Sequence, residues 1–227
     1  MIFLKRTKLA DRVLPTYTKG EEIFNMTSHI LGGILGIVAT ILCIIFASLH
    51  KNVYGIVSSA IYGASLIILY TMSSIYHGLS PKLLSKKVFQ VLDHCTIFLL
   101  IAGCYTPVAL CNIRSVSPSA GWTIFFIVWA LAIIGIILNA IDIKKYNVFS
   151  MICYLLMGWC IIFRFDLLFK SMDIVGIILL VLGGVSYTIG SILYGLGKKH
   201  KYMHSVFHLF ILLGSLLQFF SILLYVV

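Results

Sequence analysis

The chain has 227 residues, of which 61% are hydrophobic and only 11% are charged, and its mean hydropathy is +1.08. Soluble globular domains carry about 25% charged residues, so this composition excludes that class and indicates a protein embedded in a membrane. The formal net charge of +10 does not indicate nucleic-acid binding. The basic residues gather in short loops between apolar runs, where cationic side chains face anionic lipid headgroups.

Seven apolar stretches follow a polar, basic arm at residues 1–20, and residues 21–227 form one membrane domain. About 20 apolar residues in a helix cross the hydrocarbon core of a bilayer. Such spans are helical because backbone groups in lipid need internal partners. The sequence therefore predicts an all-α bundle of seven transmembrane helices. We expect these at about residues 30–49, 53–76, 88–110, 121–141, 148–168, 174–196 and 203–227.

The distribution of positive charge predicts how the bundle is oriented. If there are seven spans, the arm and the loops on its side carry 13 Lys and Arg residues, and the other side carries 4. Cytoplasmic loops of membrane proteins carry the excess of Lys and Arg. We therefore expect a multi-pass protein of the cell membrane, of the bacterial plasma membrane type, with a cytoplasmic N-terminus and an external C-terminus.

Polar side chains gather at the cytoplasmic ends of several predicted spans. His204 and His208 stand four residues apart where the last span begins, so they share one helix face. Ser73 and His77 have the same spacing where the second span ends, and Asp93 follows at the start of the third. Ionisable groups inside a membrane are costly and usually face the bundle interior. The sequence thus predicts one polar site at the depth of the inner leaflet.

Three imidazoles at one depth indicate a zinc site. His77, His204 and His208 would give Zn²⁺ three protein ligands and leave a fourth position open, as in catalytic zinc sites. The metal would lower the pKa of a bound water toward about 7. Asp93 would take the proton of that water or orient a histidine. Ser73 would hydrogen-bond the water or a developing oxyanion.

Other readings of these residues remain open. His204 and His208 could instead be interfacial residues that face lipid headgroups. His94 could replace one ligand, and His29 could be a further ligand, although a hydrogen bond in the bundle interior is the favoured role for His29. Glu21 and Asn25 are expected to brace the cytoplasmic end of the bundle as caps and interhelical hydrogen bonds.

The combined pattern resembles the progestin and adipoQ receptor family, and within it the bacterial hemolysin III branch. The resemblance covers nearly the whole chain from Glu21 onward. It implies a seven-helix fold with the N-terminus inside and zinc held by His77, His204 and His208, with Asp93 and Ser73 nearby. The residues that carry it are Glu21-x3-Asn25-x3-His29, Ser73-x3-His77, Asp93-His94, Ile101-Ala-Gly-Cys-Tyr-Thr-Pro107 and His204-x3-His208.

Three functions compete at this point. The wider superfamily includes alkaline ceramidases, so the resemblance implies a zinc-dependent hydrolase of a lipid amide or ester. The hemolysin III branch takes its name from haemolysis, which implies a pore-forming cytolysin. A non-enzymatic regulator of membrane lipids, with zinc holding the helices together, is the third. The polar groups gather at one end instead of lining a whole span, which disfavours a pore.

Overall fold

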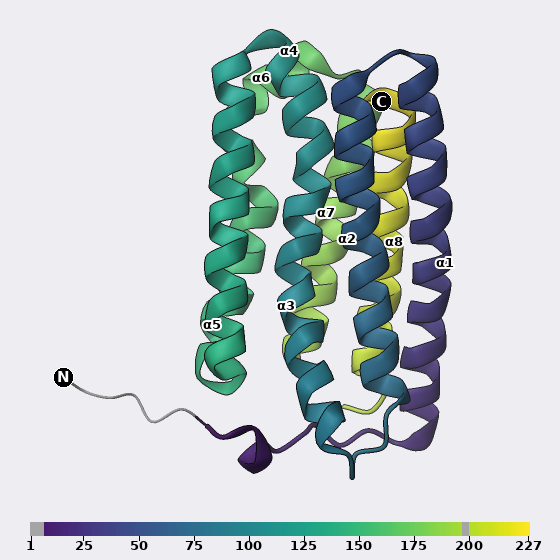
Figure 1. Ribbon diagram of the computed structural model, residues 1–227, viewed down its shortest axis with the longest axis vertical. Helices are drawn as coiled ribbons and strands as arrows, with labels where there is room; N and C mark the ends of the chain where they lie inside the picture. The colour runs from purple at the N-terminus through teal and green to yellow at the C-terminus, as the bar shows by residue number, and fades with distance from the viewer. Residues whose placement is uncertain (1–6, 197–199) are drawn as a thin grey trace, which may run out of the picture.

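The computed structural model describes residues 7–196 and 200–227, and its regular structure within these ranges is entirely helical (Figure 1). The predicted all-α fold is confirmed for these residues. Residues 1–6 of the predicted arm and 197–199 of the last basic loop lie outside the described residues. The long helices are α1 (Lys19–Leu49), α2 (Val53–Gly78), α3 (Leu84–Pro107), α5 (Pro118–Trp159), α7 (Ile174–Leu196) and α8 (Met203–Tyr225).

Short helical pieces connect the long helices. A single 3₁₀ turn, η1, lies in the arm before α1. The others follow α3 and α5 and close the end of the bundle where α8 ends. The short pieces are η1 (Leu9–Asp11), η2 (Val108–Ile113), α4 (Arg114–Val116), η3 (Cys160–Arg164) and α6 (Phe165–Ser171).

Six helical stretches among the described residues are long and apolar enough to cross a membrane. One of them, Pro118–Ser171, has 54 residues, which would extend about 81 Å as a straight helix. Asp142 interrupts it with φ −160° and ψ 99°. Ser150 Oγ donates to Asn139 Oδ1 at 2.6 Å across this break. The stretch therefore folds back on itself, as Figure 1 shows at the lower end of α5.

The outer surface of the bundle is apolar, as lipid contact requires. On α1, Ile34 and Ile41 are each 53% exposed, whereas the buried side of the helix carries small residues. This is the reverse of a soluble helix, whose large apolar residues face inward. Small residues let helix backbones approach closely in a membrane. The small buried residues of α1 are Gly32, Gly36, Ala39, Cys43 and Ala47.

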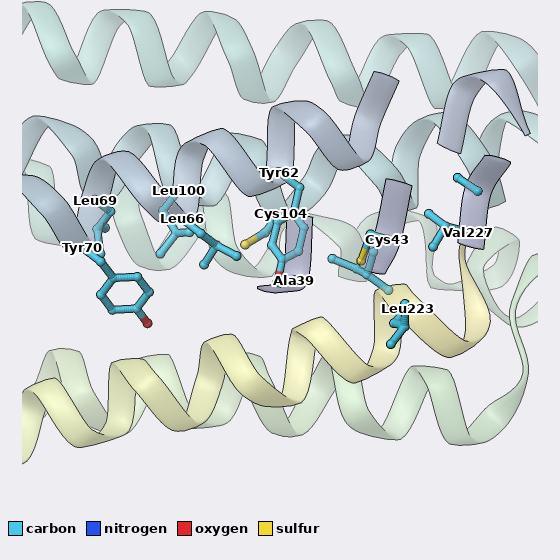
Figure 2. Packing of buried hydrophobic residues seen from close by; sticks show 12 residues of the cluster. Ala39, Cys43, Tyr62, Leu66, Leu69, Tyr70, Leu100, Cys104, Leu223 and Val227 are labelled. Atoms are coloured by element: carbon cyan, nitrogen blue, oxygen red, sulfur yellow. The ribbon is translucent and has the colours of Figure 1, made fainter. Parts of the chain in front are cut away.

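A core cluster joins α1, α2, α3 and α8. Figure 2 shows it from close by, with Tyr62 and Tyr70 of α2 among its largest members. A Cβ atom added at Gly32 would lie 2.4 Å from Cδ1 of Tyr70, so α1 packs against the face of this ring. Tyr70 OH in turn donates to Ser215 Oγ of α8 at 2.7 Å. These contacts fix the rotations of α1, α2 and α8, which carry the site described below.

The region after Pro107 differs from the prediction. The third span was expected to end at about residue 110, but the chain stays helical to Val116. Because proline lacks an N–H and clashes with the preceding turn, the π-helix η2 takes up the irregularity at this point. Asn112 Nδ2 donates to the Ser171 carbonyl oxygen at 2.8 Å and so ties η2 to α6, while its Oδ1 has no hydrogen-bond partner among the described residues.

Candidate metal centre

Three histidines meet at the end of the bundle where α8 begins. His204 and His208 lie on one face of α8, and His77 comes from the last turn of α2. The Nε2 atoms of His204 and His77 are 3.3 Å apart, and those of His208 and His204 are 3.0 Å apart. One ligand atom from each residue lies within 4.8 Å of the other two. The structure thus brings together the three residues that the sequence singled out for metal binding.

The spacing of these nitrogens matches a tetrahedral metal site. Zinc binds imidazole nitrogen at about 2.0–2.1 Å, which puts neighbouring ligands of a tetrahedral ion about 3.3–3.4 Å apart. The observed 3.3 and 3.0 Å separations lie at or just below that value. The ligand atoms of all three histidines lie within 4.8 Å of one another, close enough to share one ion.

Hydrogen bonding alone satisfies the cluster poorly. The Glu22 carboxylate lies 2.7 Å from Nδ1 of His77. An ionised carboxylate only accepts, so Nδ1 carries the hydrogen and Nε2 of His77 presents a lone pair. His204 Nε2 has two nitrogen neighbours, but it offers either one hydrogen or one lone pair. It can therefore form a hydrogen bond with only one of them. A cation that accepts the three Nε2 lone pairs would satisfy these three nitrogens, so the donor set fits a metal ion.

Glu22 contacts the other ring nitrogen of His77, Nδ1, and Lys86 holds Glu22 in turn. Lys86 Nζ is fully buried and donates to Glu22 Oε1 at 2.6 Å and to the Leu79 carbonyl oxygen at 2.9 Å. A carboxylate that orients a ligand histidine is the usual outer partner of a zinc ligand. Sequence reasoning missed both residues. The spacing of Glu22, Asn25 and His29 at i, i+3 and i+7 was a signal that Glu22 faces the same side.

A cavity of about 160 Å³ extends from His204 and His208 into the bundle. Its lining includes Ser73 and Asp93 beside His204, and it reaches Gln218 near the other end of α8. His204 and Gln218 are 14 residues apart on one helix, a rise of about 21 Å. The wall between them is mostly apolar, including Leu180 and Ile211 of α7 and α8. The cavity therefore has a polar head and a long apolar body.

His29 and His94 line the same cavity but lie outside the three-histidine group. The His29 ring stacks on His208 with centroids 3.7 Å apart, and its edge meets Tyr70. Neither ring nitrogen of His29 has a hydrogen-bond partner among the described residues. The favoured prediction of an interior hydrogen bond is therefore wrong, because ring stacking takes its place. The His94 carbonyl oxygen accepts from Tyr154 OH at 2.8 Å.

The predicted braces at the start of α1 differ from each other. Glu21 forms a capping box with Thr18, and its Oε1 accepts from the backbone N–H of Tyr202 at 2.6 Å. It thus ties α1 to the segment before α8, as predicted. Asn25 is fully buried, but its carboxamide makes no hydrogen bond within the described part of the chain.

Tyr17 reaches the site from the arm and was not among the residues that the sequence predicted for it. Its ring stacks on His204 with centroids 4.9 Å apart and lies 5.7 Å from the His77 ring. No spacing pattern links Tyr17 to a predicted helix face, so the sequence offered no signal for this contact. The remaining histidines lie elsewhere: His50 contacts the Val227 carbonyl oxygen at the opposite end, and His200 is exposed.

Comparison with known proteins places these residues in a wider group. The family described as haemolysin-III related matches residues 17–219, a range that holds Tyr17 and all three converging histidines. "Hemolysin-3" of Bacillus cereus is 41% identical over 207 residues, covering 91% of this chain and 92% of the relative. "Hemolysin-3 homolog" of Bacillus subtilis (strain 168) is 37% identical over 211 residues, covering 93% and 97%. The human "Monocyte to macrophage differentiation factor" is 28% identical over 174 residues, covering 73% and 69%.

Proposed function

The chain belongs to the haemolysin-III-related family, the hemolysin III branch of the progestin and adipoQ receptor family, and we propose that it is a zinc-dependent hydrolase of a lipid amide or ester within the cell membrane. One observation carries this proposal: three imidazoles converge, and two of them, His204 and His208, line a cavity together with a carboxylate, a hydroxyl and a long apolar wall.

The proposal includes seven spans with a cytoplasmic N-terminus and an external C-terminus. The fold-back at Asp142 supports the count, because each half of Pro118–Ser171 is long enough to cross a hydrocarbon core of about 30 Å. The excess of basic residues on the N-terminal side supports the orientation. In this topology the histidines lie within the inner leaflet, where a membrane lipid would meet them.

Five residues of the site have a role in this hydrolysis. His77, His204 and His208 would hold the zinc ion, which supplies Lewis-acid polarisation and a water of lowered pKa. The Asp93 carboxylate accepts the proton of the attacking water and returns it to the leaving group. The Ser73 hydroxyl, one turn from His77, donates to the carbonyl oxygen of the substrate as negative charge develops there. The apolar body of the cavity holds the hydrocarbon chain in place during the reaction.

Haemolysis is the second candidate, because the two bacterial relatives carry "Hemolysin-3" in their names. A channel needs polar groups along its full length. The carboxylate and the imidazoles of the cavity lie at one end and the wall beyond them is mostly apolar, which favours a lipid-binding chamber over a pore. A third candidate keeps zinc as a purely structural link between α2 and α8 in a regulator of membrane lipids.

One experiment separates the three candidates. Wild-type protein and the His204→Ala variant are reconstituted in vesicles made from extracted membrane lipids, and the lipids are profiled over time. A hydrolase consumes one class of lipid amide or ester only in the wild-type sample. A cytolysin releases an entrapped dye with no lipid change. A structural regulator does neither, and that outcome would reject the hydrolase.

A further inference from the structure

The N-terminal arm, here residues 7–18, runs across the end of the bundle where α8 begins (Figure 1). The backbone N–H of Thr7 donates to Asp142 Oδ2 at 2.8 Å, and Lys87 Nζ donates to the Ala10 carbonyl oxygen at 2.5 Å. At its other end the arm enters the capping box of α1. It is thus tied to the turn of α5, to α3 and to α1, and it spans the polar head of the cavity.

Tyr17 is the part of the arm that enters the site. Together with Pro15 it lines the cavity that also holds Asp93. Its ring covers one face of the His204 imidazole at an interplanar angle of 26°. Burial raises the pKa of the Tyr17 hydroxyl well above its usual range, and the neighbouring Tyr194 raises it further, so the ring stays neutral.

His204 needs such a restraint because it lies in the first turn of α8. The residue before that helix, Tyr202, has φ 61° and makes no side-chain cap hydrogen bond. Four backbone N–H groups at a helix start have no partner within the helix, so an uncapped first turn frays easily. Glu21 holds the backbone of Tyr202, and the Tyr17 ring holds the His204 side chain.

We propose that Tyr17 is a positioning residue that holds the His204 imidazole in its metal-binding orientation, and that the arm closes the route from the cytoplasm to the histidines. The contact that matters is the aromatic face, not the hydroxyl. Phenylalanine at position 17 therefore keeps the His204 ring in place, and alanine releases it. Access to His204 depends on this contact whether the zinc is catalytic or structural.

Labelling of histidines tests the proposal without metal or turnover. Metal-free protein is treated with diethyl pyrocarbonate, and the modified fraction of His204 is followed by mass spectrometry. His200, which is exposed and four residues away, serves as the internal reference. We expect His204 to react slowly in the wild type. In Tyr17→Ala its rate rises by about fivefold or more, the change that corresponds to the loss of one stacked ring pair.

Matched variants decide between positioning and general loosening. Tyr17→Phe labels like the wild type, because the ring is kept. Lys87→Ala frees the middle of the arm without touching Tyr17 and raises the His204 rate in the same direction. His200 reacts equally in all variants. Equal labelling of His204 and His200 in the wild type, or an unchanged His204 rate in Tyr17→Ala, would overturn the proposal.

A second readout uses the metal. After zinc loading, a coloured chelator removes the ion, and the rate of release is measured. Faster release from Tyr17→Ala than from Tyr17→Phe is expected. A protein that binds no zinc but still shows a His204 protected by Tyr17 would reject the proposed function and leave intact the closure of the site by the arm.

Discussion

Nδ1 of His77 lies 2.7 Å from Oε2 of Glu22, so α1 orients a histidine that belongs to α2. Glu22 is itself paired with the buried Lys86 of α3. Three helices therefore determine the direction in which one imidazole presents its lone pair.

Weakening this support should weaken metal binding. Glu22→Gln keeps the shape of the side chain but removes the charge that favours the Nδ1–H tautomer of His77. We expect zinc affinity to fall by about 10–100-fold, the usual effect of losing an outer partner of a zinc ligand. Competition with a chelator of known affinity measures it. Asp166→Asn, at an exposed carboxylate, is the control, and equal affinities in the two variants would contradict the assigned role of Glu22.

The three histidines should hold about one zinc ion per chain. Elemental analysis of purified protein measures this number. His77→Ala, His204→Ala and His208→Ala should each lose most of the metal, because two imidazoles leave a zinc site incomplete. His50 and His200 lie outside the cluster, so His50→Ala and His200→Ala should keep the zinc. Full retention in His77→Ala would shift the third ligand to another residue.

Asp93 distinguishes catalysis from scaffolding. Asp93→Asn keeps the shape of the side chain but removes its basicity. If the protein is a hydrolase, turnover of the lipid amide or ester should fall by about 10²–10⁴-fold at saturating zinc. Zinc content and thermal stability should stay near the wild-type values. A fully active, zinc-loaded Asp93→Asn protein would remove Asp93 from the role of base.

Topology is tested with a reporter that is active only outside the cytoplasm. Fused after Val227, it should be active, and inserted near Lys199 it should be silent. The prediction follows from the 13 to 4 distribution of basic residues and from the fold-back at Asp142. The reverse pattern would place the histidines in the outer leaflet.

Close packing of α1 on α2 should make Gly32 sensitive to substitution. In Gly32→Ala the new Cβ would lie 2.4 Å from Tyr70 Cδ1, and we expect a loss of about 1–3 kcal/mol in the free energy of unfolding. Gly33→Ala is the control on the same helix, because its nearest contact would be an ordinary 3.9 Å to Tyr70 Cβ. Thermal unfolding in detergent compares them, and equal midpoints would contradict this account.

The sequence was sufficient for the features that repeat along one helix. The i, i+4 spacing of His204 and His208 and the apolar runs both follow from helix geometry, and both are found in the structure. The contacts between helices could not be predicted in this way. Glu22 and Lys86 meet only because three helices have particular rotations, and those rotations depend on packing such as Gly32 against Tyr70.

The position of Tyr17 could not be predicted from the sequence, because the arm has no periodic pattern that assigns its side chains to a face. Its position depends on single hydrogen bonds, such as that from Thr7 to Asp142, 135 residues away. His29 was misjudged for a related reason. Its polar ring suggested a hydrogen bond, but the neighbouring ring of His208 made stacking available.

The long separation between Thr7 and Asp142 has a consequence for biogenesis. The arm is synthesised before the helices, its anchor in the α5 turn is made 135 residues after Thr7, and His204 follows later still. The cluster cannot form until α8 has joined α2, whereas the partners of the arm in α1, α3 and the α5 turn are all synthesised before α8. The order of synthesis therefore allows the arm to take up these contacts before α8 brings His204 and His208 to the site.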